Sequence, residues 1–530
     1  MRLYNTLGGK KEDLQTLEPR KVKMYVCGPT TYNFIHLGNA RPLVVFDTVR
    51  RYLAYRGYQV TYVQNFTDVD DKIINRANEE GADALELAQR YINAYFEDAG
   101  ALNIMTADVH PQVSQHMEEI IAAVQGLIDK GYAYEIDGDV YYRVSAFKDY
   151  GKLSGRSLED MLAGARVEID ERKENAMDFA LWKKAKAGEP AWPSPWGDGR
   201  PGWHIECSVM STKYLGDSFD IHGGGSDLIF PHHENEIAQA EALTGKPFVR
   251  YWMHNGFITV NNEKMSKSLG NFFILRDILA QYPADVVRFY LISTHYRSPL
   301  DFHDGKLEEA RKALGRLKTT LRLVEEFMEN GAAASPMGSE DEAFIQSLEG
   351  LKAAFVEAMD DDFNTAKAIG HLFEMSHVIN SFVSQADKNN HGHQAAVGQA
   401  YQLFFALGDI LGIFFEVGKQ SPAVVEEVLL VLADLRSQAR ADKDYSLADQ
   451  IRDFFAQIGV RVEDSPQGSR FRYEEAPSLE ALIEQLLALR AAFKKNKAFD
   501  KADLIRDRLR AAGVIIEDTR EGVRWKLADA

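Results

Sequence analysis

Cysteine is scarce in this chain of 530 residues, where it occurs only as Cys27 and Cys207. Two cysteines so far apart provide no disulfide framework of the kind that stabilises small secreted domains. No uninterrupted apolar run approaches the roughly 20 residues that a membrane-spanning helix needs, and the first residues lack a basic segment followed by an apolar one. We therefore expect a cytoplasmic protein without a membrane partner.

Positive charge is also in short supply. The chain has 61 Lys and Arg against 79 Asp and Glu, a net charge of −18. Because phosphate binding is driven largely by Lys and Arg, this balance argues against general affinity for nucleic acid, and any RNA contact must use local basic patches. A chain of this length exceeds what one hydrophobic core serves, so we expect several domains.

The N-terminal region has a strand–helix–strand pattern. Residues 22–27 are predicted to form a strand that ends in a Gly-Pro turn, and residues 59–65 form a second one. Between them, apolar residues recur at helical spacing from about Asn39 to Tyr55. Such a unit has parallel strands and a binding crevice at their carboxyl ends. The predicted fold class is therefore α/β, with a Rossmann-type parallel sheet.

Along the rest of the chain, the pattern of residue types changes twice. Residues 111–200, with a helix near 112–130 followed by Tyr- and Val-rich strands, are interpreted as an insertion between two α/β halves. From residue 306 the pattern is mostly helical, with predicted linkers at 330–341, 385–396 and 418–422. The tail contains an internal repeat, in which twelve residues between Leu435 and Arg470 recur 54 positions later. Each copy is predicted to form two helices and a hairpin (460–472 and 514–526).

Two motifs are candidates for phosphate binding. His36-Leu37-Gly38-Asn39 precedes the first helix, where free N–H groups and the helix dipole attract phosphate. Taken alone, this tetrapeptide fits a loop histidine that bonds the backbone equally well. Lys264-Met265-Ser266-Lys267-Ser268 follows a predicted strand at 256–260, and its two ammonium groups suit a loop that closes on a triphosphate.

A third group of candidate residues lies between Trp203 and Glu236. Three consecutive glycines at 223–225 allow close approach of a ligand, and His232 and Glu236 are spaced to share one helix face. With Cys27 and Cys207 they form a conceivable four-ligand zinc set. Neither HExxH nor CxxC is present, and scattered Cys and His are usually structural, so spacing alone leaves the metal undecided.

Together these motifs resemble those of class I aminoacyl-tRNA synthetases, in particular the cysteinyl-tRNA synthetases. The second motif matches KMSKS at every position, whereas the first has Leu37 and Asn39 where HIGH has Ile and His. The similarity extends over nearly the whole chain, through residues 24–30, 65–73, 203–236 and 359–365.

The resemblance implies activation of L-cysteine by ATP and transfer to the 3′ end of tRNA-Cys by a monomeric enzyme. It implies one Zn²⁺ per chain and ATP with Mg²⁺ as substrate. The zinc ligands would be Cys27, Cys207, His232 and Glu236. The implied catalytic residues are His36, Asn39, Lys264 and Lys267, and the ATP contacts are Gly38, Gly224 and Lys267. The residues that would surround the bound cysteine are Gly28, Thr67, Trp203, His204 and Asp227. For Trp203, the alternative is that it packs in the hydrophobic core.

The family architecture, together with the internal repeat, implies a division of the chain into seven parts. These are the first half of the catalytic domain (1–110), the connective insertion (111–200), the second half (201–290), a stem-contact region (291–335), a helical bundle (342–417) and two copies of a small α/β module (424–475 and 477–530).

The family usually has one such module, which reads the anticodon. Residues 426–475 have 7 basic and 11 acidic residues, whereas 477–530 have 11 and 9. Trp525, where the first copy has Phe471, also provides a larger stacking surface for a base. The second copy is therefore predicted to bind the anticodon, with Arg506, Asp518, Arg524 and Trp525 as candidates.

Two other functions share some of these features. A ligase that joins activated cysteine to a small amine, as in mycothiol synthesis, has the same activation chemistry, but the long RNA-like tail argues against it. A non-catalytic tRNA-binding regulator would have no need of the intact Lys264–Ser268 string or of a complete zinc set.

Overall fold

The structure is a computed structural model that divides into two compact units, Met1–Phe415 and Glu416–Ala530, each considered by itself. No helix in the described part of the chain is both long and apolar enough to cross a membrane. The described residues are 1–157, 172–260, 263–264, 272–328, 337–415, 422–465, 468–473, 477–519 and 522–527.

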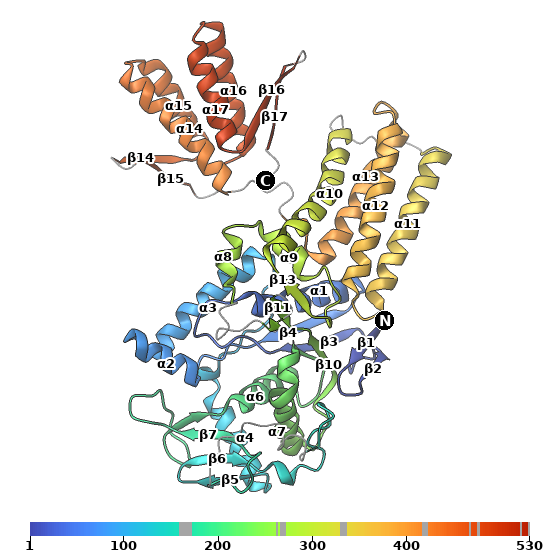
Figure 1. Ribbon diagram of the computed structural model, residues 1–530, viewed down its shortest axis with the longest axis vertical. Helices are drawn as coiled ribbons and strands as arrows, with labels where there is room; N and C mark the ends of the chain where they lie inside the picture. The colour runs from blue at the N-terminus through green and yellow to red at the C-terminus, as the bar shows by residue number, and fades with distance from the viewer. Residues whose placement is uncertain are drawn as a thin grey trace. The chain divides into compact units, whose positions relative to one another are not determined.

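A four-stranded parallel sheet forms the centre of the first unit (Figure 1). Helices cover both of its faces, so its strands consist largely of buried residues. The predicted Rossmann-type α/β fold is thereby confirmed. The strand order is β10 (Val249–Asn255), β9 (Phe219–Gly225), β3 (Lys21–Val26) and β4 (Gln59–Gln64), and the covering helices include α1 (Leu37–Tyr55), α6 (Trp203–Leu215) and α7 (Glu234–Thr244).

The segment between β4 and β9 contains a helical hairpin and a separate antiparallel sheet. The hairpin consists of α2 (Asp71–Glu80) and α3 (Ala84–Ala101). The predicted helix near 112–130 is present as a short 3₁₀ turn, η1 (Val113–Gln115), followed by α4 (Met117–Asp129). The sheet has the order β5 (Ala133–Ile136), β6 (Asp139–Tyr142), β7 (Phe179–Lys184) and β8 (Gly199–Pro201), with a second 3₁₀ turn, η2 (Val144–Ala146), after β6.

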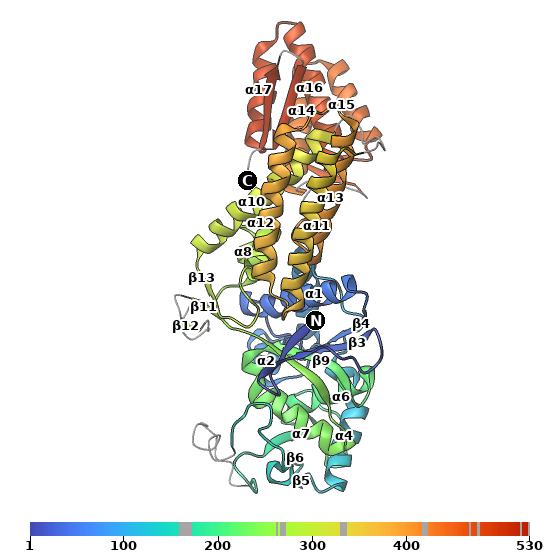
Figure 2. The same cartoon turned by 90° about the vertical axis from the view of Figure 1, so that its right-hand side faces the viewer.

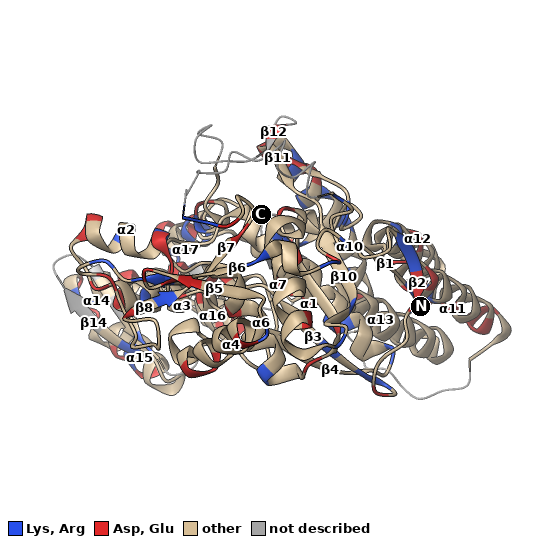
Figure 3. Ribbon diagram, turned by 90° about the horizontal axis from the view of Figure 1, so that it is seen from below, with Lys and Arg blue, Asp and Glu red and all other residues tan. Residues whose placement is uncertain are grey.

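Two small sheets complete this part of the unit. The N-terminal hairpin consists of β1 (Arg2–Asn5) and β2 (Lys10–Asp13), and β2 has basic and acidic residues side by side (Figure 3). After β10, a three-stranded sheet has the order β12 (Glu263–Lys264), β11 (Ile258–Val260) and β13 (Leu300–Phe302). The helices α8 (Leu275–Leu279) and α9 (Ala284–Leu291) lie between β12 and β13 in the sequence.

Four long helices, which follow the central parallel sheet in the sequence, pack into a bundle (Figure 2). They are α10 (Asp304–Met328), α11 (Ser339–Asp360), α12 (Thr365–Gln385) and α13 (His391–Leu411). Asp362, at the corner between α11 and α12, is fully buried and accepts hydrogen bonds from the backbone N–H of Tyr4 and the hydroxyl of Tyr296, both at 2.8 Å. The bundle is thereby attached to the N-terminal hairpin.

The second unit contains the two predicted copies, each with two helices and a hairpin. Their apolar helix faces pack into one common core, which includes Leu432 from the first copy and its equivalent, Leu486, from the second. The duplicated module is therefore one packed body. The first copy consists of α14 (Pro422–Ala441), α15 (Tyr445–Gln457), β14 (Arg461–Ser465) and β15 (Gly468–Arg472). The second consists of α16 (Leu479–Lys495), α17 (Phe499–Ala511), β16 (Val514–Thr519) and β17 (Gly522–Leu527).

Candidate active site

A cavity of about 370 Å³ lies at the carboxyl ends of the parallel strands. This is where ligands bind in open α/β sheets, because the loops that follow the strands converge there. Its wall is formed by the loop after β3, the start of α1, the turn after β9 and the segment after β10. Among the predicted residues it is lined by Cys27, Gly28, His36, Gly38, Asn39, Trp203 and Asp227.

The first motif forms the N-terminal cap of α1. His36 is the cap residue: its Nδ1 accepts a hydrogen bond from the backbone N–H of Asn39 at 3.3 Å, and Oδ1 of Asn39 accepts one from the backbone N–H of His36 at 3.2 Å. This reciprocal pair is a capping box. Asn39, in place of the second histidine of HIGH, therefore has a structural role as the cap partner of His36. The positive end of the helix dipole faces the cavity.

Gly28 lies where only glycine fits. Its backbone N–H donates to Oδ1 of Asn65 at 3.0 Å. A Cβ atom at this position would lie 1.6 Å from the carbonyl oxygen of Asn65, which belongs to the backbone after β4. The two loops therefore touch backbone to backbone beneath the cavity.

The four predicted metal ligands converge beside this cavity, whose lining includes Cys27. Cys27 follows β3, Cys207 lies on α6, His232 lies in a single π-helical turn, η4 (Ile229–His233), and Glu236 lies on α7. Their ligand atoms lie within 4.8 Å of one another. The two Sγ atoms are 3.8 Å apart, and Nε2 of His232 is 3.0 Å from Oε1 of Glu236. Two sulfurs, one imidazole and one carboxylate are a ligand set that suits zinc.

This cluster combines groups that ionise with opposite sign: burial opposes protonation of His232, but Glu236 and Cys207 raise its pKa to about 10. Burial raises the pKa of the Cys27 thiol, whereas a hydrogen bond from Cys27 lowers the pKa of Cys207 to about 6. Burial opposes ionisation of Glu236, but the neighbouring His222 and His232 lower its pKa to about 2. Two adjacent thiols beside a carboxylate cannot all ionise without a compensating positive charge.

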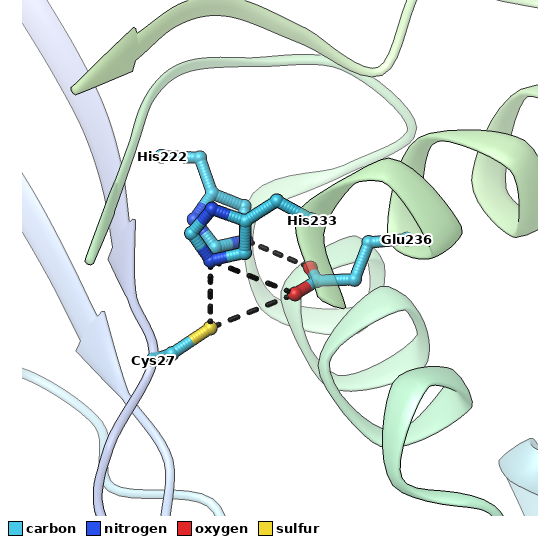
Figure 4. Close-up of side chains that lie close together, drawn as sticks. All are labelled: Cys27, His222, His233 and Glu236. Carbon is cyan, nitrogen blue, oxygen red and sulfur yellow. Dashed lines mark hydrogen bonds and ion pairs between the residues drawn. The ribbon is translucent and has the colours of Figure 1, made fainter. Parts of the chain in front are cut away.

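A second, overlapping group was not predicted: Cys27, His222, His233 and Glu236 (Figure 4). Here the ring nitrogens that face Cys27 and Glu236 already have partners, whereas Nδ1 of His222, on the far side of its ring, has none among the described residues. Nε2 of His222 is 2.8 Å from Oε2 of Glu236, while His233 contacts Sγ of Cys27 at 3.3 Å through Nε2 and His254 at 2.8 Å through Nδ1.

His232 differs from these histidines. It is 1% exposed, yet Nε2, the nitrogen that faces the cluster, makes no hydrogen bond of acceptable geometry with any residue that the structure describes. Its other ring nitrogen, Nδ1, lies 2.9 Å from Nδ1 of His204. An imidazole that is oriented through one nitrogen and leaves the other aimed at a carboxylate is typical of a metal ligand. The set with Cys207 and His232 therefore fits zinc better than the set with His222 and His233.

The surrounding residues divide into those that line the cavity and those behind it. Trp203 is 40% exposed and stacks on His232 with ring centroids 4.1 Å apart, so the core-packing alternative is wrong. Thr67 is buried and donates its hydroxyl hydrogen bond to Glu206 at 3.1 Å. Thr67, His204 and Gly224 lie behind the described lining.

The predicted lysines are only partly described. Lys264 lies in β12, with its backbone paired to Thr259 of β11, whereas Lys267 lies outside the described residues. Lys72, which sequence reasoning did not single out, lines the cavity with its ammonium group 5.7 Å from the centroid of the Tyr32 ring.

The candidate residues in the tail lie on the second copy. Arg506 is exposed on α17 and forms ion pairs with Asp503 and Asp507 at 3.1 and 3.0 Å. Its repeat equivalent, Arg452, forms the same two pairs on α15. Trp525, on β17, is partly buried and packs against the common core. Asp518 lies in β16 and Arg524 in β17.

Three protein families match successive parts of the chain. Residues 13–312 match "tRNA synthetases class I (C) catalytic domain", residues 354–416 match the DALR domain, and residues 476–525 match "Cysteinyl-tRNA ligase anticodon binding domain". The third match coincides with the second copy of the repeat.

Similar proteins and structures agree with these matches. Proteins named cysteine–tRNA ligase from Pelotomaculum thermopropionicum and Desulforamulus reducens are each 57% identical, over 89% of this chain and 99% of theirs. The uncovered 11% is about 58 residues, close to the length of one copy.

Among solved structures, a methionyl-tRNA synthetase from Mycobacterium tuberculosis has a TM-score of 0.56 at 16% identity, covering 78% of this chain and 94% of its own. A LeuRS from Agrobacterium radiobacter has a TM-score of 0.56 at 13% identity, covering 77% and 86%. These likenesses show the shared fold. The catalytic-domain match and the high identity over most of the chain show that it belongs to the cysteine–tRNA ligase family of class I aminoacyl-tRNA synthetases.

Proposed function

We propose that the chain selects L-cysteine through a zinc ion, activates it with ATP and transfers it to tRNA-Cys. The observation that carries the proposal is that Cys27 lines the cavity together with the helix cap of His36 and Asn39. Behind Cys27, the side chains of Cys207, His232 and Glu236 complete the cluster of possible metal ligands. The cavity thus has a thiol-binding end and a phosphate-binding end.

Selection of cysteine over serine requires more than shape, because the two differ only by sulfur in place of oxygen. Cys27, Cys207, His232 and Glu236 would hold the zinc ion, which would supply a soft site that favours a thiolate. A serine hydroxyl stays protonated and would bind such a site weakly. His204 orients His232 from behind, and Trp203 covers its outer face. Asp227, at the cavity wall, is positioned to accept hydrogen bonds from the amino group of the substrate.

The reaction then has two steps. The cysteine carboxylate attacks the α-phosphorus of ATP and pyrophosphate leaves, after which the terminal 2′-OH of the tRNA attacks the adenylate carbonyl and AMP leaves. Charge that builds up on phosphate oxygens is stabilised by the N-terminus of α1, by His36 and Asn39, and by Lys264 and Lys267. Gly38 and Gly224 allow close approach of the nucleotide, which enters with Mg²⁺.

The decisive experiment combines zinc analysis with cysteine-dependent exchange between ATP and pyrophosphate. Cys207→Ser and His232→Gln should lose the single zinc and lower kcat/KM for cysteine by about 100-fold, and the preference for cysteine over serine should fall. His233→Gln, which affects only the overlapping set, should retain zinc. Loss of zinc from His233→Gln, but not from His232→Gln, would assign the metal to the other set.

The exchange assay, together with an assay for charging of tRNA-Cys, separates the rival functions. Exchange without charging of tRNA-Cys would point to the small-amine ligase, and no exchange at all would leave a tRNA-binding regulator. We further propose a monomer, which light scattering at assay concentration tests; a stable dimer would contradict it.

Within the tail, we propose that the second copy reads the anticodon. The family match at 476–525 and the greater positive charge of this copy support the assignment. Because the copies share one core, matched point variants are a sharper test than deletion. Arg506→Glu should raise KM for tRNA-Cys about 10-fold, whereas Arg452→Glu, with the same local ion pairs, should not. A larger effect of Arg452→Glu would reverse the assignment.

A further inference from the structure

Arg41 is a fully buried arginine on α1, just after the helix cap. Its guanidinium donates hydrogen bonds to three backbone carbonyl oxygens: those of Gly256 at 2.7 Å, Phe257 at 2.8 Å and Ser298 at 2.6 Å. No carboxylate among the described residues pairs with it. Burial lowers the pKa of Arg41 to about 10. A buried charge without a counter-charge is costly, so the three carbonyl groups are the interactions that retain it.

The three carbonyl groups belong to the segments that begin the small sheet. Gly256 and Phe257 connect β10 to β11, and Ser298 precedes β13, which pairs in parallel with β11. The backbone is crowded at this junction, since a Cβ atom on Gly256 would lie 2.5 Å from the carbonyl oxygen of Ser298. Arg41 therefore holds the segments that lead into two neighbouring strands, β11 and β13, against α1, and the three elements lie together in Figure 1.

These connections link the two phosphate-binding motifs. α1 begins with the cap formed by His36 and Asn39, while β11 pairs with β12, which contains Lys264. We propose that Arg41 is a positioning residue that sets the distance between the cap of α1 and the backbone of β12 at Lys264, and so the geometry in which these two elements meet the α-phosphate of ATP. The inference rests on the proposed function of both motifs. The candidate metal ligands lie just after β3 and on α6, η4 and α7, and none of them is among the described partners of the Arg41 guanidinium.

This arrangement predicts a specific kinetic change. Misplacing transition-state contacts by about 1 Å lowers rates by about 100-fold, so Arg41→Met should lower kcat of cysteine-dependent ATP–pyrophosphate exchange by about that factor. KM for cysteine should stay within about twofold, and zinc content should not change. Arg41→Lys should recover only part of the rate, because an ammonium group lacks the planar fork that reaches three carbonyls. Millimolar guanidinium should partly restore Arg41→Gly.

Arg288 provides a matched control. It is also fully buried, on α9, and donates to the carbonyls of Leu411 and Leu102 at 2.9 and 3.0 Å and to Asp47 at 2.5 Å. Neither arginine is part of the described lining of the cavity. Two partners of Arg41, Gly256 and Phe257, do line it, whereas these partners of Arg288 do not. Arg288→Met should lower the melting temperature without separating kcat from KM, with rates expressed per active site by adenylate burst titration.

The outcomes separate this inference from the function on which it rests. If wild-type protein shows no exchange, the proposed function fails. If wild type is active and Arg41→Met loses activity only in proportion to its folded fraction, or if Arg288→Met shows the same loss of kcat per active site, Arg41 is merely structural and the inference is overturned. Rescue by guanidinium together with a loss confined to kcat supports it.

Discussion

Replacing one leucine in the first tail copy should loosen the second copy. Leu432 lies on α14, is 0% exposed, and belongs to the same core as Leu482 and Leu486 of α16. Replacing a buried leucine with alanine typically destabilises by about 2.7–5.0 kcal/mol, because apolar contacts are lost and a cavity remains. A loss of about 3 kcal/mol corresponds to an increase of about 150-fold in the equilibrium constant for opening.

Amide hydrogen exchange measures this opening in each helix separately. In the full-length Leu432→Ala variant, we expect exchange to accelerate by about 150-fold in α16 and α17 as well as in α14 and α15. The equivalent change in the second copy, Leu486→Ala, should give the same pattern. Leu372→Ala is the control, because Leu372 is also 0% exposed but lies on α12 in the other unit.

The reasoning would be refuted if Leu432→Ala accelerated exchange in α14 and α15 alone. The copies would then open independently, and the core shared across α14 and α16 would contribute little to stability. Accelerated exchange in α12 would point to a general loss of stability instead.

Three further results follow from individual side chains and cavities. Burial lowers the pKa of His110 from 6.5 to about 4, so the folded protein keeps the ring neutral while the unfolded chain takes up a proton below pH 6.5. Acidification from pH 7 to pH 5 should therefore lower the free energy of unfolding by about 2 kcal/mol through this residue. Urea unfolding should show a smaller loss of stability between these pH values in His110→Gln, and a loss equal to that of the wild type would refute the assignment. Gly28→Ala should abolish adenylate formation, because its Cβ would overlap the Asn65 carbonyl, whereas Gly100→Ala, with open space around it, should leave the rate unchanged in the same assay. Chelation of zinc at neutral pH should remove cysteine-dependent exchange, and added Zn²⁺ should restore it; activity that survives complete removal of the metal would contradict the assigned role.

Local sequence patterns predicted the elements that local interactions determine. The expected helix at Asn39–Tyr55 is α1, which begins two residues earlier because His36 caps it, and both hairpins of the tail lie where the repeat placed them. The predicted linker at 385–396 was too long, since α13 begins at His391, capped by Asn390. Asparagine is common both in loops and at helix N-caps, so the sequence alone does not show that Asn390 caps a helix.

Contacts between distant segments could not be predicted in the same way. Nothing local distinguishes His232, with a ring nitrogen aimed at Glu236, from the adjacent His233, whose nitrogens are satisfied by Cys27 and His254. Likewise, Arg41 falls within an ordinary amphipathic helix pattern, and only the packing of β11 and β13 against α1 shows that its charge is buried. The resemblance, not spacing, selected His232.

The two ends of the cavity are held by different parts of the framework. Cys207 and Glu236 lie on helices α6 and α7, whereas α1 is fastened through Arg41 to the strand pair that leads to Lys264. Because the proposed thiol-binding and phosphate-binding ends have separate supports, changes in amino-acid selectivity and changes in the rate of activation should arise from different positions. On the proposed function, the metal ligands would determine which amino acid binds, while the helix cap and small sheet would determine how fast it reacts.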